Sequence, residues 1–198
     1  MTCGAVMVAY GEQTAISERR ASEALDHICP DLPVHVHRER TGQLTDMAES
    51  RYAKVTMLDW TPFDHTAYLD ADTQVYQPID AGFQMLRDGW DMAITVDQNQ
   101  TEHEWLWHCG GADREFTLLA LRYQALQLQA GIFFIAKNER TEALWRAWKF
   151  EWEVYRNQDQ GALLRALSRH PIKIWLLGRP WNSGAIIGHH FGAIRRAI

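Results

Sequence analysis

The stretch Thr66-Ala67-Tyr68-Leu69-Asp70-Ala71-Asp72-Thr73 (TAYLDADT, residues 66–73) joins an apolar run to two closely spaced acids. The apolar run predicts a buried strand, so both carboxylates fall where the chain leaves the sheet, and ligands of open α/β sheets bind there. Two acids in one place repel each other unless a cation lies beside them. Mg²⁺ and Mn²⁺ prefer carboxylate oxygens and also bind phosphates. Asp70 and Asp72 are therefore candidate metal ligands, with an ordinary acidic turn as the alternative.

Outward from this strand, short apolar runs alternate with segments of helical periodicity. Further strands are predicted at 4–10, 33–37, 91–96, 131–136 and 172–176. Helices are predicted at 14–29, 45–60, 139–155 and 159–167, the first capped by Thr14 or Ser17. Segment 97–114 is expected to be a loop or lid, and segment 178–198 to be irregular. This alternation predicts an α/β domain with a mixed, mostly parallel sheet flanked by helices.

Composition bounds the class of protein. A chain of 198 residues, 46% of them hydrophobic, is long enough for one well-packed domain. The 20 basic and 25 acidic side chains argue against a protein that mainly coats nucleic acid. The sequence has no apolar run that would span a bilayer and no features of a signal peptide. Its three cysteines follow no CxxC pattern, so we expect reduced thiols and a cytoplasmic location.

The nine tryptophans fall into two groups. Those on one predicted helix are expected to pack in the core, and they are Trp145, Trp148 and Trp152. Those in predicted loops are better placed to stack on a ligand, and they are Trp105, Trp107 and Trp181.

Other polar residues have competing interpretations. His35 and His37 share a strand face, which favours a solvated sheet edge over a metal pair. His103 and His108 are five residues apart, so they do not form the i, i+4 pair of a metalloprotease helix. Asp97 follows the strand predicted at 91–96, and it either lines the cleft or caps the following turn.

The order of several motifs resembles the GT-A glycosyltransferases, in particular glycosyltransferase family 8, the glycogenin-like and bacterial galactosyltransferase group. In that family a Leu-Asp-x-Asp segment binds the metal and the donor diphosphate, as Asp70 and Asp72 would here. Ala9-Tyr10 ends the first strand, where the family places its nucleotide base. Tyr52-Ala53-Lys54 matches a Tyr-Ala-Arg segment whose basic residue reaches the donor.

Later segments follow the same order. Gln129-Ala130-Gly131-Ile132 resembles an Asn-x-Gly-Val strand, and Asp159-Gln160 matches an Asp-Gln pair beside the reacting sugar. Pro180-Trp181-Asn182 is similar to part of a Leu-Pro-x-x-Trp-Asn stretch. His189, Gly192 and Arg195 parallel a His-x-x-Gly-x-x-Lys segment, whose His is the third metal ligand and whose Lys touches the diphosphate. Arg195 replaces that Lys, and His190 is the alternative to His189.

The resemblance implies one GT-A-like domain over residues 1–198 that moves a hexose from a nucleotide-sugar to an acceptor hydroxyl with retention. The expected donor is UDP-glucose or UDP-galactose. Asp70, Asp72 and His189 would bind Mn²⁺ or Mg²⁺, and Gln129, Asp159 and Gln160 would act at the reacting sugar. The residues that would contact the donor are Ala9, Tyr10, Lys54, Asp70, Gly192 and Arg195.

Two other functions stay open. A sugar-phosphate nucleotidyltransferase would carry a Gly-rich, Lys-containing signature after the first strand, and residues 9–19 lack one. A non-catalytic nucleotide-sugar-binding protein is the other alternative. No Walker, Gly-x-Gly-x-x-Gly or Gly-x-Ser-x-Gly motif is present. The sequence does not identify the acceptor molecule. The acceptor site would be formed by segment 97–114 or by a partner subunit in a homo-oligomer.

Overall fold

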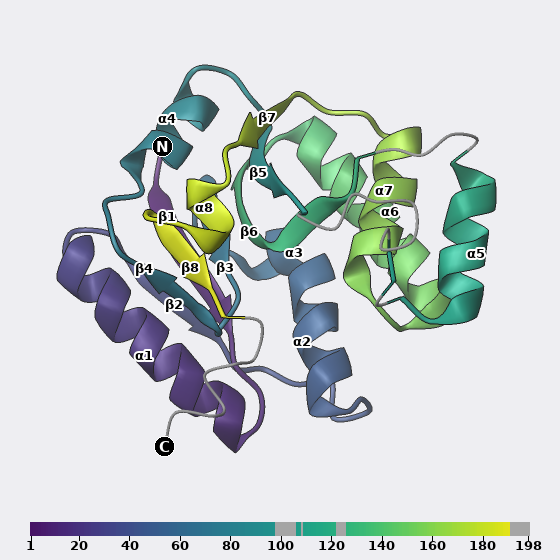
Figure 1. Cartoon of the computed structure of the whole chain (residues 1–198), viewed down its shortest axis with the longest axis horizontal. Coiled ribbons are helices and arrows are strands. Elements are labelled where there is room, and N and C mark those ends of the chain that lie inside the picture. Colours follow the sequence, from purple (N-terminus) through teal and green to yellow (C-terminus); the bar gives the residue numbers. More distant parts are fainter. Residues whose placement is uncertain (98–105, 108, 122–125, 191–198) are drawn as a thin grey trace.

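A computed structural model describes residues 1–97, 106–107, 109–121 and 126–190, which form a mixed α/β fold (Figure 1). The central sheet has six strands in the order β2-β1-β3-β6-β5-β7. They are β1 (Cys3–Val8), β2 (Val34–His37), β3 (His65–Leu69), β5 (Met92–Val96), β6 (Leu128–Ala136) and β7 (Ile174–Leu177). Among these described strands only β6 runs antiparallel to its neighbours, so the predicted mostly parallel sheet is confirmed.

Helices cover both faces of this sheet, because successive side chains of each strand point to opposite sides. On β1, Ala5 and Met7 enter one apolar cluster, whereas Val6 and Val8 enter the other. The first cluster lies under α1 (Glu12–Ile28) and α4 (Asp80–Arg87). The second is covered by α2 (Asp46–Val55), α3 (Met57–Trp60), α6 (Glu139–Tyr155) and α7 (Asp159–Arg169), and α5 (Gly111–Ala120) packs on α7.

A second, two-stranded sheet lies beside α1. It pairs β4 (Thr73–Val75) with β8 (Ile187–His189) in antiparallel register, and the short helix α8 (Pro180–Ser183) packs against β8. The expectation of an irregular segment at 178–198 is therefore wrong for residues 180–183 and 187–189. Strand β8 has three residues, and its hydrogen bonds come from pairing with β4, a distant segment. A local sequence pattern could therefore not predict it.

The tryptophans of α6 pack in the core, as predicted, and their indole N–H groups reach two other helices. Trp145 donates to the backbone carbonyl of Lys54 at 3.1 Å, and Trp148 donates to that of Asp159 at 2.8 Å. Both indoles are buried, so each bond satisfies a donor that has left water. The end of α2 and the start of α7 are thereby held at fixed positions on α6.

Two helix boundaries differ from the prediction. Helix α1 begins at Glu12 with Gly11 as its N-cap, and Gly11 has a φ of 81° that other residues rarely adopt. Thr14 and Ser17 therefore lie inside the helix. The helix predicted at 45–60 is interrupted at Thr56, whose hydroxyl donates to the Tyr52 carbonyl at 2.8 Å. The sequence pattern also failed to predict α4, β4 and α5.

Two aromatic interpretations change with the packing. Trp181 is only 9% exposed, and its ring meets Phe134 edge to face at 5.6 Å, so the prediction that it stacks on a ligand is wrong. His37 stacks on Trp60 with ring centroids 4.2 Å apart, and His35 lies 5.7 Å from the same ring. These half-buried imidazoles belong to an aromatic cluster, and burial lowers the pKa of His37.

Candidate active site

A cleft of about 670 Å³ lies beyond the carboxyl ends of β1, β3 and β5. Tyr10, Asp70 and Asp97 follow these three strands and all line the cleft. Further lining residues come from the first turn of α1, from α2, from β6, from the start of α7 and from the end of β8. This is the place where open α/β sheets bind their ligands.

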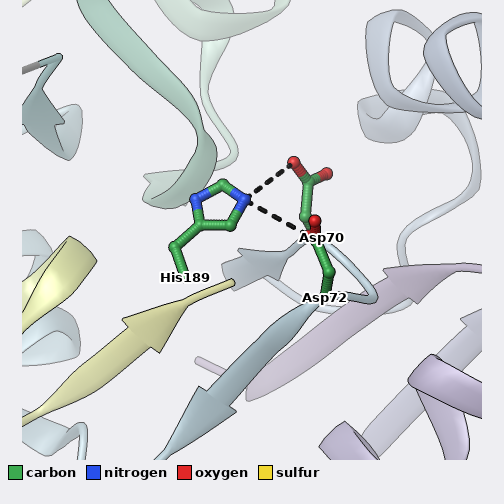
Figure 2. A group of neighbouring side chains, drawn as sticks. All are labelled: Asp70, Asp72 and His189. Carbon is green, nitrogen blue, oxygen red and sulfur yellow. Dashed lines mark ion pairs between the residues drawn. The ribbon is translucent and has the colours of Figure 1, made fainter. Parts of the chain in front are cut away.

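An acidic pair and a histidine meet at the cleft. His189 Nε2 lies 3.2 Å from Asp72 Oδ1 and 3.9 Å from Asp70 Oδ2 (Figure 2). The small sheet brings them together, because Thr73, next to Asp72, is paired with His189 in the β4–β8 register. His189 therefore joins the acids, whereas His190 lies 3.5 Å from the Tyr76 hydroxyl.

A hydrogen bond orients the His189 ring. Its Nδ1 is 3.1 Å from Oδ1 of Asn182, a buried residue of α8. Because an amide oxygen only accepts hydrogen bonds, Nδ1 carries the proton and Nε2 faces the two carboxylates. Histidines that ligate metals are commonly held in this way through their second ring nitrogen.

The three residues fit a divalent cation. One ligand atom from each of Asp70, Asp72 and His189 lies within 4.8 Å of the other two. Ligands at about 2.1 Å around an octahedral ion are separated by about 3 Å when adjacent and about 4 Å when opposite. Burial raises the pKa of Asp70 even though Lys54 lies beside it, so a further positive charge would stabilise its carboxylate. Two carboxylates and one imidazole are ligands that divalent cations take in proteins.

A buried lysine links the acidic pair to α7. Lys54 Nζ lies 2.7 Å from Asp159 Oδ2 and 3.2 Å from Asp70 Oδ1. Burial by itself would lower the pKa of Lys54, but the two carboxylates outweigh burial and raise it. Lys54 in turn outweighs burial at Asp159 and lowers the pKa of that carboxyl. Both shifts favour the charged forms of Lys54 and Asp159, and the lysine holds the two carboxyl groups in place.

Three amides and Asp97 form a network on the same side of the cleft. Gln160 Nε2 donates to Gln129 Oε1 at 3.0 Å, and both amide groups approach Asp97 Oδ2, at 3.5 and 3.4 Å. Gln127 donates to Gln160 Oε1 at 3.0 Å. Asp97 thus lines the cleft, which was one of its two predicted roles.

The residues expected at the nucleotide base, Ala9 and Tyr10, are buried and covered by neighbouring side chains. Tyr10 lines the cleft but is only 2% exposed, and its hydroxyl donates to the Glu39 carbonyl at 2.5 Å. The Arg40 guanidinium lies over its ring at 5.1 Å from the centroid. Ala9 is buried beside it. Gly192 and Arg195, expected at the diphosphate, lie outside the described residues.

Of the two other loop tryptophans, Trp107 lines the cleft and is 63% exposed. Trp105, His103 and His108 lie outside the described residues.

Sequence reasoning missed three residues that support this site. Tyr68 donates its hydroxyl to Asp70 Oδ1 at 2.9 Å, and burial raises the pKa of Tyr68 so that the phenol stays protonated. Asn182 orients His189, and Gln127 orients Gln160. The position of Tyr68 two residues before Asp70, on the same strand face, was the only local signal, because the other contacts join distant segments.

The fold belongs to a known class. A mixed, mostly parallel sheet with one antiparallel strand beside β3 and helices on both faces is shared with solved glycosyltransferases of the GT-A fold. The predicted fold class is confirmed in this structure.

Solved structures of glycosyltransferases are similar over most of the chain. One is a glycosyltransferase involved in glycosylation of the major capsid of PBCV-1, with 12% identity, a TM-score of 0.63 and coverage of 96% of this chain and 92% of that chain. Mouse xyloside xylosyltransferase 1 has 12% identity, a TM-score of 0.59 and coverage of 92% and 87%. The galactosyltransferase LgtC, solved with donor and acceptor sugar analogues, has 14% identity, a TM-score of 0.53 and coverage of 88% and 73%.

No protein-family model matches the sequence, and no curated protein matches it. The three cysteines are free thiols, as predicted. Among the described helices, none has the length and apolar character needed to cross a bilayer.

Gly131 gives a direct test of the cation site. A Cβ at this position would lie 2.6 Å from Asp70 Oδ2 and would also collide with the His189 ring. We expect Gly131→Ala to lower Mn²⁺ affinity about 10- to 100-fold, the range for disturbed supports of metal ligands. Isothermal titration with Mn²⁺ measures this change. Gly111→Ala is the matched control, because a Cβ there meets nothing within 4 Å. Equal Mn²⁺ affinity in the Gly131→Ala and Gly111→Ala variants would contradict the assignment of this site.

Proposed function

We propose that this protein is a metal-dependent glycosyltransferase that moves a hexose from a UDP-sugar to an acceptor hydroxyl with retention of configuration. The observation that carries the proposal is the meeting of Asp70, Asp72 and His189 at the cleft of a GT-A fold. This arrangement favours a transferase over a sugar-phosphate nucleotidyltransferase or a non-catalytic nucleotide-sugar-binding protein. The reason is that the acids, Lys54, Asp159 and Gln160 are held together around one cleft.

In this proposal the acids and His189 bind the cation that faces the donor diphosphate. When bound by these residues, a divalent cation would supply positive charge against the departing diphosphate. Asp70 is oriented for this task by Tyr68 and Lys54, and Asp72 completes the set from the turn before β4. Arg195 would add positive charge at the diphosphate, and Gly192 would allow close approach of the backbone.

The reacting sugar would lie over Asp159, Gln160 and Gln129. Asp159 and Gln160 line the cleft but are only 6% and 7% exposed, so both side chains are largely removed from solvent. A carboxylate and amides in such surroundings stabilise the positive charge that develops at the sugar and orient its hydroxyls. Lys54 keeps Asp159 ionised, and Ala9 and Tyr10 would flank the base.

We extend the proposal to the organisation of the protein. Residues 1–198 would form a single GT-A domain, with the acceptor site completed by segment 97–114 or by a second subunit of a homo-oligomer. The unpaired cysteines are consistent with a reducing, cytoplasmic environment.

The test is UDP release from UDP-glucose and from UDP-galactose, measured with and without Mn²⁺. We expect release that depends on Mn²⁺ and falls by at least about 100-fold in EDTA. A thermal-shift panel of UDP, GDP and CDP with Mn²⁺ identifies the nucleotide in parallel. Binding of UDP without any release from either sugar would favour a non-catalytic binder, and a preference for GDP or CDP would change the donor.

A further inference from the structure

Gln127 is a buried side chain that does not line the cleft yet contacts a residue that does. It lies just before β6 and is 0% exposed. Its Oε1 accepts a hydrogen bond from the backbone N–H of Leu106 at 2.8 Å. Its Nε2 donates to Gln160 Oε1 at 3.0 Å. Gln127 therefore bridges the turn that carries Trp107 and the amide of Gln160.

The backbone donor at one end sets the direction of this chain of amides. A backbone N–H only donates, so Gln127 must turn its oxygen to Leu106 and its NH₂ group to Gln160. Gln160 must then turn its oxygen to Gln127. Its NH₂ group is left to face Gln129 Oε1 at 3.0 Å and Asp97 Oδ2 at 3.5 Å.

The other end of the chain requires the same direction. The backbone N–H of Gly131 donates to Gln129 Oε1 at 3.0 Å, which turns the Gln129 NH₂ group to Asp97 Oδ2 at 3.4 Å. Because both ends are backbone donors, reversing one amide places two oxygens or two NH₂ groups against each other. Such a buried mismatch is costly.

We propose that Gln127 is a positioning residue that locks Gln160 with its NH₂ group, not its carbonyl oxygen, toward Asp97 and the cleft. The NH₂ group then faces the Asp97 carboxylate, which lines the cleft and can accept a hydrogen bond from a sugar hydroxyl. An unlocked glutamine would present either end. This inference rests on the proposed function, because it assigns the sugar to that part of the cleft.

The test compares Gln127→Glu with Gln127→Met for UDP release from the UDP-sugar that the wild type turns over. The carboxylate introduced by Gln127→Glu has no N–H group, so Gln160 must reverse and place its oxygen against Asp97 and Gln129. We expect kcat to fall about tenfold at about pH 8, the effect of one misdirected hydrogen bond, with the Kd for UDP and Mn²⁺ unchanged. Gln127→Met removes the donor to Gln160 Oε1 and leaves only the contacts with Gln129 and Asp97 to orient this amide, so we expect a smaller loss of kcat.

The pH profile separates positioning from a merely structural role. As pH falls to about 5.5, the buried carboxylate of the Gln127→Glu variant takes up a proton, and its O–H can donate to Gln160 as the native NH₂ group does. We therefore expect the ratio of Gln127→Glu to wild-type kcat to rise toward one. Within the part of the chain that the structure describes, Asp97 is hydrogen-bonded to this network, and Asp159, paired with Lys54, adjoins Gln160. All three are present in every variant, so the ratio removes their own titration.

Each result of this experiment either supports or overturns the proposed role of Gln127. Recovery at low pH in Gln127→Glu, without recovery in Gln127→Met, supports the proposal. Full activity of both variants at every pH overturns it, and so does a loss in Gln127→Glu that is the same at all pH values. If Gln127→Glu fails to fold, as shown by circular dichroism, Gln127→Met carries the test, and an unchanged kcat there overturns the proposal.

A control for charge and a distinction between two kinds of failure complete the experiment. Gln84→Glu, on the exposed side of α4, is the control for an added charge. Failure of the proposed function is distinct from failure of this inference, because the wild type would then release no UDP.

Discussion

Replacing Asp72 by Asn is expected to lower Mn²⁺-dependent UDP release by about 10²- to 10³-fold, the effect of removing one electrostatic stabiliser of a transition state. Asparagine keeps the shape of the side chain but removes the negative charge that faces His189 Nε2 at 3.2 Å. Asp72 is partly exposed, with 26% of its side chain accessible, so the substitution should leave the fold intact. A coupled assay of UDP release measures the rate, and a thermal melt checks the fold.

Two comparisons sharpen this prediction. Asp26→Asn removes one acid from an exposed position of α1 and should leave the rate unchanged, which controls for the change in net charge. Asp72→Ala should lower the rate of UDP release as much as Asp72→Asn does, because both variants lack the negative charge of the carboxylate. Full metal-dependent activity in the Asn variant would show that Asp72 is not a ligand of the cation.

The second large effect concerns stability. Lys54→Met should lower the free energy of unfolding by about 3–5 kcal/mol at neutral pH, the range for removing one partner of a buried ion pair. The substitution leaves Asp70 and Asp159 close together without the cation that lies 3.2 and 2.7 Å from them. Urea unfolding of the wild type and the variant measures the difference. Lys137→Met, at an exposed position, is the control, and a variant as stable as this control would contradict the prediction.

The pH dependence follows from the directions of the two pKa shifts. The pKa of Lys54 is raised above 10.5, so its contribution to stability is full below that pH and is lost as pH rises through the raised value. The pKa of Asp159 is lowered below 3.8, so its contribution is present above that pH and is lost as pH falls through the lowered value. In Lys54→Met the carboxyls protonate more easily, and the stability deficit should shrink in acid. Adding Asp159→Asn to Lys54→Met should recover part of the loss.

The elements predicted correctly are those with a strong local pattern. Strand β3 follows from an unbroken apolar run, and α6 was predicted with the same bounds, Glu139–Tyr155, because its large apolar residues recur at helical spacing. Helix α4 was missed because it has only eight residues, and α5 because it leaves the apolar residues Leu118 and Leu119 exposed. The strand β4 has three residues and depends on β8 for its partners.

The candidate site divides in the same way. The sequence pattern was enough to identify the two acids, and the resemblance to a known family added Lys54 and the Asp159-Gln160 pair. It left His189 and His190 as alternatives, because adjacent strand residues point to opposite faces and only the pairing with β4 determines which one faces Asp72. Asn182 was noted only as part of a stretch similar to a family motif, with no role assigned, and Gln127 carried no local signal.

By itself, then, the sequence determined the α/β class, the strand that ends in two acids, and the order of the polar residues, since all of these depend on neighbours a few positions apart. Only the tertiary structure decided that Lys54 lies between Asp70 and Asp159, that His189 faces the acids, and that Gln127 directs Gln160. Those contacts join residues far apart in the chain. Their geometry depends on strand register and on the packing of α2, α6 and α7, and short-range periodicity carries no information about either.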